Sequence, residues 1–193
     1  NQVIACFFSG QVKGSGGLIG YIFREGNNVT DSFSTGSVTG IHSIGPFIGE
    51  AGTGTKITRS YSADYLHRLS DSFTLGSGGL LGSGNYNSVI ENSYWSADTI
   101  GKSLLPESPN SINYVGLPLA TLQCAIQADT NSINSHCVSE DGAREGLDAG
   151  ITLYQGWSVS GHWDFGTAQQ LPGLKLNNTV YRDSDGDGSL DHL

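Results

Sequence analysis

The stretch Gly17-Leu18-Ile19-Gly20 recurs twice, as Gly45-Pro46-Phe47-Ile48-Gly49 and as Gly79-Leu80-Leu81-Gly82. About a dozen residues after each copy, a serine precedes an aromatic residue, at Ser32-Phe33, Ser60-Tyr61 and Ser93-Tyr94. A repeat of roughly 25 to 35 residues is one supersecondary unit that cannot bury its own apolar face, so neighbouring units must stack to form a core. The N-terminal half of the chain is therefore predicted to be a repeat array.

The repeat segments have the composition of β-strands. They are short, rich in β-branched and aromatic residues, and no window before about residue 115 keeps the apolar period of a helix. The 28 glycines are about twice the usual share, and we expect them at repeat corners that need positive φ. The Gly101-Lys102-Ser103 triplet is not a phosphate-binding loop, because the pattern requires a further glycine five residues before Gly101, where Ser96 stands. We predict a mainly β fold, a parallel β-solenoid of roughly three to four rungs over residues 1–100.

Stacking in register would place equivalent residues of successive repeats about 4.8 Å apart. The aromatic ladder would then contain Phe7, Phe33, Tyr61 and Tyr94. The ladder of opposite facing would contain Cys6, Ser32, Ser60 and Ser93. Cys6 is therefore interpreted as a ladder member rather than a reactive thiol. The sequence leaves open which ladder faces inward, because a narrow coil favours small residues inside and a wider one admits aromatic rings.

A resemblance to a known repeat family emerges from these residues. Gly16-Gly17-Leu18-Ile19-Gly20, followed by Val29-Thr30-Asp31-Ser32-Phe33-Ser34-Thr35-Gly36-Ser37-Val38, is similar to the GLUG motif of large bacterial surface and secreted proteins. Residues 92–99 resemble the end of such arrays, and residues 163–166 with 171–175 resemble a segment that often follows. The resemblance implies an extracellular, adhesin-like structural segment of a bacterial surface protein or filament. It supplies no catalytic residues.

Residues 101–176 break the repeat pattern. Pro106, Pro109 and Pro118 indicate a loop, and residues 117–128 offer one or two helical turns with an apolar face. We expect a small cap of loop and short helix over the open end of the stack, because an unpaired terminal rung is a sticky edge. His162 is a candidate polar residue, but the neighbouring aromatic residues favour packing within the cap.

Two cysteines lie in this cap region. In a secreted chain, Cys124 and Cys137 predict a local disulfide. The alternative is a metal site formed by the two cysteines with His136, which would lack both a CxxC pair and a fourth ligand.

Charge and the placement of acidic residues disfavour several function classes. The net charge is −9 and no basic cluster is present, so binding to a nucleic acid or an anionic membrane by charge is not expected. Membrane insertion is not expected either, because no long apolar run exists. The acids within the repeats occupy different repeat positions and form no glycosidase pair, so we do not predict an enzyme. A carbohydrate-binding or carbohydrate-processing β-helix is the alternative, and an exposed row of Tyr and Trp beside carboxylates would favour it.

The acidic segment Asp183-Ser184-Asp185-Gly186-Asp187-Gly188-Ser189-Leu190-Asp191 is the strongest chemical signal. It places carboxylates at positions 1, 3, 5 and 9 of a calcium loop, a glycine at position 6 and a carbonyl at position 7. The pattern resembles the DxDxDG loops of EF-hand-like and thrombospondin type 3 repeats. We predict calcium ligands at Asp183, Asp185, Asp187, Ser189 and Asp191 in a tail or linker of residues 177–193. Position 12 falls beyond Leu193, and a solvated acidic tail is the alternative.

The first repeat strand begins almost at Asn1, which indicates that the chain is part of something longer. An exposed first rung leaves unpaired backbone groups that bind other strands. We therefore expect partners at the rung edges, either other segments of a larger surface protein or further copies of the chain. A glycan or a cell-surface target is a further expected partner of an adhesin-like segment.

Overall fold

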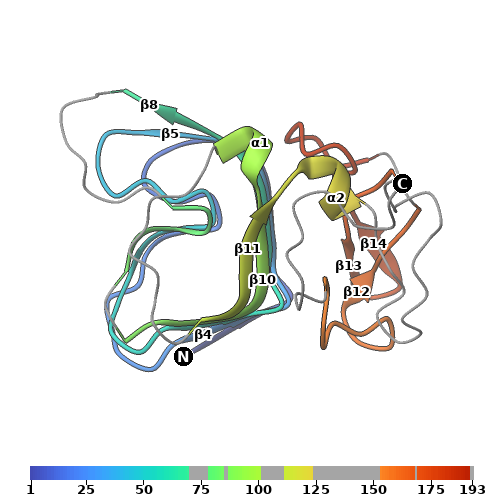
Figure 1. Cartoon of the computed structure of the whole chain (residues 1–193), viewed down its shortest axis with the longest axis horizontal. Coiled ribbons are helices and arrows are strands. Elements are labelled where there is room, and N and C mark those ends of the chain that lie inside the picture. The colour runs from blue at the N-terminus through green and yellow to red at the C-terminus, as the bar shows by residue number, and fades with distance from the viewer. Residues whose placement is uncertain (70–77, 85–86, 101–110, 124–152, 168, 192–193) are drawn as a thin grey trace, which may run out of the picture.

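A computed structural model describes residues 1–69, 78–84, 87–100, 111–123, 153–167 and 169–191. It shows a mainly β fold in which a curled parallel sheet lies beside a smaller C-terminal part, residues 153–167 and 169–191 (Figure 1). The predicted Cys124–Cys137 disulfide and the alternative site with His136 lie outside the described residues. Among the described residues, no helix has the length and hydropathy needed to cross a membrane.

The large sheet contains eight strands, and all of its pairings are parallel. In sheet order they are β1 (Gln2–Ile4), β4 (Asn28–Thr30), β7 (Lys56–Thr58), β10 (Val89–Ser96), β8 (Tyr61–Arg68), β5 (Phe33–Gly40) and β2 (Phe7–Lys13), with β11 (Ile112–Leu117) paired to β10. A second parallel sheet contains β3 (Ile19–Tyr21), β6 (Ile48–Ala51) and β9 (Leu81–Gly84). An antiparallel sheet contains β12 (Trp163–Asp164), β13 (Gly173–Leu176) and β14 (Thr179–Tyr181). The helices are α1 (Ala97–Ile100) and α2 (Leu119–Gln123).

Equivalent positions of successive repeats lie side by side, as the sequence predicts. Phe33 pairs with Tyr61 in parallel register, and their ring centroids are 5.2 Å apart. The Ser32 N–H donates to the Ser60 hydroxyl oxygen at 3.3 Å. Figure 1 shows the traces of the repeats one behind another. The in-register stacking prediction is confirmed.

The region beyond residue 100 contains both expected and unexpected structure. α2 lies inside the 117–128 segment for which a short helix is predicted. β11, however, adds a further parallel strand to the large sheet within the segment that its prolines assign to a loop. Residues 112–117 contain no proline and include the strand-favouring residues Ile112, Tyr114 and Val115. Their pairing with β10 therefore outweighs the prolines on either side, which favour a loop.

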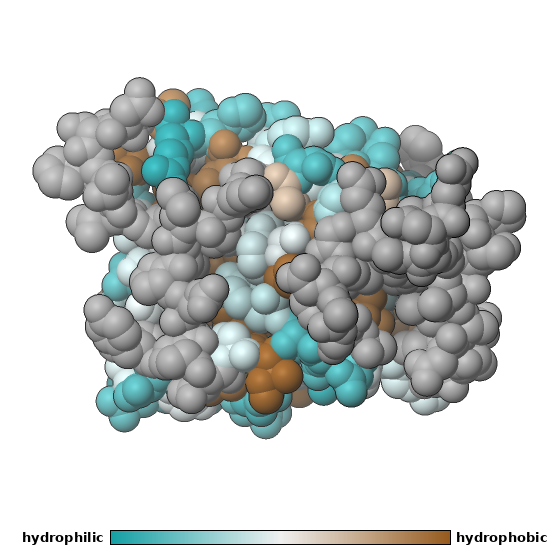
Figure 2. Space-filling view, viewed as in Figure 1, coloured by the Kyte–Doolittle hydropathy of each residue, from teal (hydrophilic) through white to brown (hydrophobic). Residues whose placement is uncertain are grey.

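Two cores occupy the two sides of the large sheet. One lies between the two parallel sheets and contains aliphatic residues such as Val29, Ile57 and Ile90 with Ile48 and Leu81. The other contains the aromatic ladder and is closed by the C-terminal part through Trp157, Trp163, Phe165, Leu171 and Leu174. The aromatic ladder therefore faces away from the second parallel sheet. On the face shown in Figure 2, the hydrophobic residues form separate patches among hydrophilic ones.

The expectation that glycine turns the repeat corners is wrong for the motif glycines. The expectation is confirmed at Gly26 and Gly54, whose φ values are 68° and 67°. The corner two residues before each aromatic ladder member uses a residue that is not glycine, with a positive φ of 47° to 53°: Ala5, Asp31, Arg59 and Asn92. The glycines of the motif permit close approach of neighbouring groups. A Cβ on Gly45 would lie 2.0 Å from the Ile48 carbonyl oxygen, and one on Gly79 would lie 2.0 Å from the Trp95 ring. Close packing between repeats, rather than backbone conformation, explains these glycines.

Candidate metal centre

The acidic segment is docked on the outer face of the large sheet. It follows β14 and lies over strands β2, β5 and β8. A Cβ on Gly186 would lie 3.3 Å from the Ala63 Cβ, and one on Gly188 would lie 2.8 Å from the Gly36 Cα. Only a chain without side chains at these two positions approaches the sheet so closely. The segment is therefore a packed part of the fold rather than a solvated tail.

Asp183 anchors the loop and is fully buried. Its Oδ1 accepts hydrogen bonds from the N–H groups of Gly186 at 2.8 Å and Asp187 at 3.2 Å. Its Oδ2 accepts from the Gly188 N–H at 2.8 Å and from the Ser9 hydroxyl at 3.4 Å. Burial raises the pKa of this carboxyl despite the hydrogen bonds, which act in the opposite direction. The carboxylate is thus fixed in position from both the loop and the sheet.

Asp185 and Asp187 complete a group of three carboxylates with Asp183. One oxygen from each of the three lies within 4.8 Å of the others. Asp185 and Asp187 are exposed, and turns within the loop orient them, since the Ser189 N–H donates to the Asp187 Oδ1 at 2.7 Å. Oxygen ligands in such a group suit a hard cation such as Ca²⁺, which also removes the repulsion among the three negative charges. The structure therefore brings together three of the residues predicted as ligands.

Asp191 lies elsewhere in the loop. Its Oδ1 accepts a hydrogen bond from the Ser184 N–H at 3.0 Å, and its Oδ2 accepts from the Ser184 hydroxyl. Its own N–H donates to the Arg182 carbonyl at 2.7 Å. In this position Asp191 connects the end of the loop to Arg182 and Ser184, directly after β14. Ser189 is not a member of the carboxylate group, and its N–H donates to the Asp187 Oδ1.

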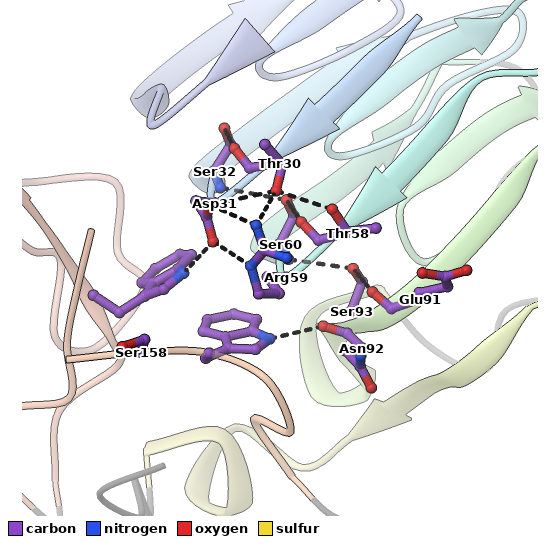
Figure 3. Close-up of polar contacts among 12 residues, drawn as sticks. Thr30, Asp31, Ser32, Thr58, Arg59, Ser60, Glu91, Asn92, Ser93 and Ser158 are labelled. Carbon is purple, nitrogen blue, oxygen red and sulfur yellow. Dashed lines mark hydrogen bonds and ion pairs between the residues drawn. The ribbon is translucent and has the colours of Figure 1, made fainter. Parts of the chain in front are cut away.

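A row of polar groups at the repeat corners joins the sheet to the C-terminal part (Figure 3). Asp31 accepts hydrogen bonds from Arg59 Nε at 2.7 Å, Arg59 Nη2 at 2.8 Å and the Trp163 indole N–H at 3.0 Å. Burial alone would raise the pKa of Asp31, but the hydrogen bonds and charge of Arg59 outweigh it and lower the pKa. The Trp157 indole N–H donates to the Asn92 carbonyl at 2.8 Å. This arrangement is a structural joint, because its donors and acceptors satisfy one another.

The residues around His162 behave as the cap interpretation predicts. Trp163 is 1 % exposed and Phe165 is 4 % exposed, and both belong to the aromatic core. His162 itself is half-buried. Packing of its neighbours, rather than chemistry at the imidazole, explains this segment.

A second buried carboxyl, Asp64, was not singled out from the sequence. Its Oδ2 accepts hydrogen bonds from the Ser62 hydroxyl at 3.0 Å and from the Ser34 hydroxyl, which also contacts the Pro46 carbonyl at 2.8 Å. Its Oδ1 has no hydrogen-bond partner among the described residues. Burial raises the pKa of Asp64 to about 7. The sequence gives no indication that Asp64 is buried. Its counterpart in the preceding repeat is Gly36, which has no side chain.

Comparison with protein-family models, curated proteins and solved structures finds no match to this chain. The similarity to the GLUG motif and to calcium loops therefore stays a prediction from the residues themselves.

Proposed function

We propose that the chain is a structural, adhesin-type segment of a bacterial extracellular surface protein or filament, stiffened by calcium. The observation that carries the proposal is the burial of the aromatic ladder. Phe33, Tyr61 and Tyr94 are 0 % exposed between the large sheet and the C-terminal part. Aromatic residues that serve a binding or catalytic cleft need an open face, whereas those that hold repeats together do not.

The pairing pattern supports a GLUG-type solenoid. Successive repeats place Val29, Ile57 and Ile90 in register on the large sheet. They place Ile19, Ile48 and Leu81 in register on the second sheet. Each repeat thus contributes strands to two parallel sheets that share one aliphatic core, which is the arrangement of a coil whose rungs stack by backbone hydrogen bonds. Such a stack suits a load-bearing spacer.

Calcium has a structural role in this proposal. Asp183, Asp185 and Asp187 hold the ion, and Asp183 also accepts the Ser9 hydroxyl of the sheet. A bound ion therefore strengthens the attachment of the C-terminal loop to the large sheet. Because the ion binds the folded loop only, it stabilises the folded state by mass action.

A calcium titration of the intact protein tests this role. At roughly a hundredfold excess over the dissociation constant, calcium adds about 2.7 kcal/mol, or about 5–10 °C in melting temperature. We expect Asp185→Ala with Asp187→Ala to abolish this rise, whereas Glu25→Ala with Glu50→Ala, which removes the same charge elsewhere, retains it. A melting temperature that does not respond to calcium in the unmutated protein would leave an acidic loop without a metal role.

The carbohydrate alternative has less support. It requires an exposed row of Tyr and Trp beside carboxylates, but Trp157 and Trp163 are 1 % exposed and Trp95 is 8 % exposed. The described residues thus place all three tryptophans of the chain in cores. Binding of the intact protein to a panel of polysaccharides, or their cleavage, is the result that would favour the alternative.

A further inference from the structure

A buried hydroxyl without a partner lies beneath the acidic loop. Thr35 of β5 is 0 % exposed, and its Oγ1 has no hydrogen bond of ordinary geometry to any other described residue. Buried polar side-chain atoms of folded proteins nearly always have a partner, because an unpaired one has lost its bonds to water without replacement. The Thr35 oxygen therefore indicates a partner other than these residues.

Thr35 occupies the middle of the row of the large sheet on which the loop rests. It pairs with Ser9 of β2 on one side and with Ala63 of β8 on the other. The Ser9 hydroxyl donates to Asp183 Oδ2 at 3.4 Å, and a Cβ on Gly186 would lie 3.3 Å from the Ala63 Cβ. Side chains at paired positions of neighbouring strands point to the same face of a sheet. The Thr35 side chain is thus directed at the loop, between these two contacts.

The Thr35 side chain also lies next to the Asp183 carboxyl. Burial raises the pKa of Asp183, and the Thr35 side chain is the strongest of the groups that oppose this rise. Asp183 is one of the three carboxylates that offer an oxygen to a cation, the others being Asp185 and Asp187. The partnerless hydroxyl of the sheet and the carboxylate group of the loop are therefore neighbours.

The three carboxylates leave a bound calcium ion short of ligands. Calcium takes about six to eight oxygen ligands. Asp191 does not contribute within the described residues, because its carboxylate accepts from Ser184 instead. Water completes the coordination beside Asp185 and Asp187, which are exposed, but has no access beside Asp183, which is fully buried. On the buried side, a further ligand has to come from the protein.

The threonine hydroxyl meets the chemical requirement for this ligand. Its oxygen carries two lone pairs, and neither accepts a hydrogen bond from a described residue. Calcium is a hard cation that binds neutral oxygens as well as carboxylates. A neutral ligand also adds no further negative charge to a loop in which three carboxylates already repel one another.

We propose that Thr35 Oγ1 is a ligand of the cation held by Asp183, Asp185 and Asp187, so that the ion bridges β5 and the acidic loop. The proposal rests on the calcium role proposed above and adds a ligand from the repeat stack. The site is then complete only while the loop is docked on the sheet. Docking and calcium binding therefore strengthen each other by the same factor, which makes the ion a specific link between the repeat stack and the C-terminal part.

Calorimetric titration of the intact protein with calcium tests this assignment. Thr35→Val keeps the shape of the side chain but removes the oxygen, and we expect it to weaken calcium binding at least about tenfold. Thr35→Ser keeps the oxygen and should bind calcium much as the unmutated protein does. Thr39→Val is the matched control, since Thr39 lies further along β5 in the row of Lys13 and His67, and it should leave the affinity unchanged.

The melting temperature without calcium separates coordination from packing. Because the Thr35 hydroxyl is buried without a partner, its replacement by a methyl group should leave the calcium-free protein equally stable or more stable. The rise in melting temperature that calcium causes should be smaller in Thr35→Val than in the unmutated protein. A residue that acts only in packing would lower the melting temperature equally with and without calcium.

Three results would overturn the proposal: an unchanged calcium affinity in Thr35→Val, an equal loss of affinity in Thr35→Ser, or a calcium-free Thr35→Val protein that melts below the unmutated one. In each case, a calcium-dependent rise in the melting temperature of the unmutated protein would leave the proposed function intact. An unmutated protein that binds no calcium would overturn both this ligand and the calcium role.

Discussion

Asp64 shows how one residue links the packing of the repeats to pH. The Ser34 hydroxyl has one proton but contacts two acceptors, the Pro46 carbonyl and the Asp64 carboxyl. If Asp64 is protonated, it donates to Ser34, which then donates to Pro46, and both contacts are satisfied. If Asp64 is ionised, the single Ser34 proton can serve only one of the two acceptors, and the negative charge of the Asp64 carboxylate stays fully buried. Burial raises the pKa of Asp64 to about 7, although the hydrogen bonds from Ser34 and Ser62 act in the opposite direction.

We predict that Asp64 makes the protein less stable as the pH rises from about 4 to 7. The folded state holds the proton over this window and the unfolded state does not, so the free energy of unfolding falls with rising pH and levels off above 7. Asp64→Asn removes this dependence and should stabilise the protein by about 2–4 kcal/mol at pH 8 relative to its effect at pH 4. Urea unfolding of both proteins at the two pH values measures the difference, and an equal effect at both would contradict the prediction.

Asp31 and Arg59 are the second residue-scale case, with the opposite sign. The pKa of Asp31 is lowered by Arg59, so the pair stabilises the folded state above the ordinary carboxyl pKa and loses this contribution as the pH falls through the lowered value. Arg59→Ala should cost about 1–3 kcal/mol at pH 7, because Asp31 stays largely buried while Arg59 is partly exposed. The cost should shrink at pH 3.

Thermal or urea unfolding measures the effect, and Lys56→Ala is the matched control. Lys56 pairs with Glu91 at 2.9 Å, but its side chain is 44 % exposed, so its loss should cost less than about 1 kcal/mol. Equal costs for the two variants would show that the corner pair contributes no more than a surface pair.

At the scale of the repeat element, the motif glycines separate into different roles. A Cβ on Gly79 would lie 2.0 Å from the Trp95 ring, and Trp95 also lies against Gly116. A Cβ on Gly20, in the first copy of the same motif, meets nothing nearer than the Ser15 hydroxyl at 3.5 Å. The register makes Gly82 the counterpart of Gly20 in the third copy, and a Cβ on Gly82 would lie 2.3 Å from the Ser43 carbonyl oxygen. The same repeat position thus has a strict steric requirement in one copy and none in another.

We predict that Gly79→Ala destabilises the protein by about 1–3 kcal/mol, because the ring of Trp95 has to shift within a packed core. Gly20→Ala should change the free energy of unfolding by less than about 0.5 kcal/mol, as for ordinary surface substitutions. Urea unfolding, with tryptophan emission as the probe, measures both. Similar costs for the two variants would indicate that backbone conformation, not contact with Trp95, determines the glycine.

At the scale of the whole molecule, the C-terminal part covers one side of the repeat stack. Residues as distant in sequence as Tyr61 and Pro172 meet there, where the Tyr61 hydroxyl donates to the Pro172 carbonyl at 2.8 Å. The same part provides Tyr181 against Phe7 and the acidic loop against Gly36. The repeat stack and the C-terminal part therefore share one aromatic core. The calcium titration addresses this scale, because it measures how firmly the C-terminal part is attached to the repeat stack.

The sequence by itself determined the repeat, its strands and their register, because equivalent residues at a fixed period stack one strand spacing apart. It also determined that Asp183, Asp185 and Asp187 converge, since alternate residues of a tight glycine-containing loop turn toward one centre. Only the tertiary structure decided which side of the sheet the aromatic ladder faces. Strand alternation defines two faces, but the cover comes from residues far along the chain. Likewise, only the packing of neighbouring repeats buries Asp64, gives Gly79 its steric role and adds β11 to the sheet, because these depend on contacts that no local pattern encodes.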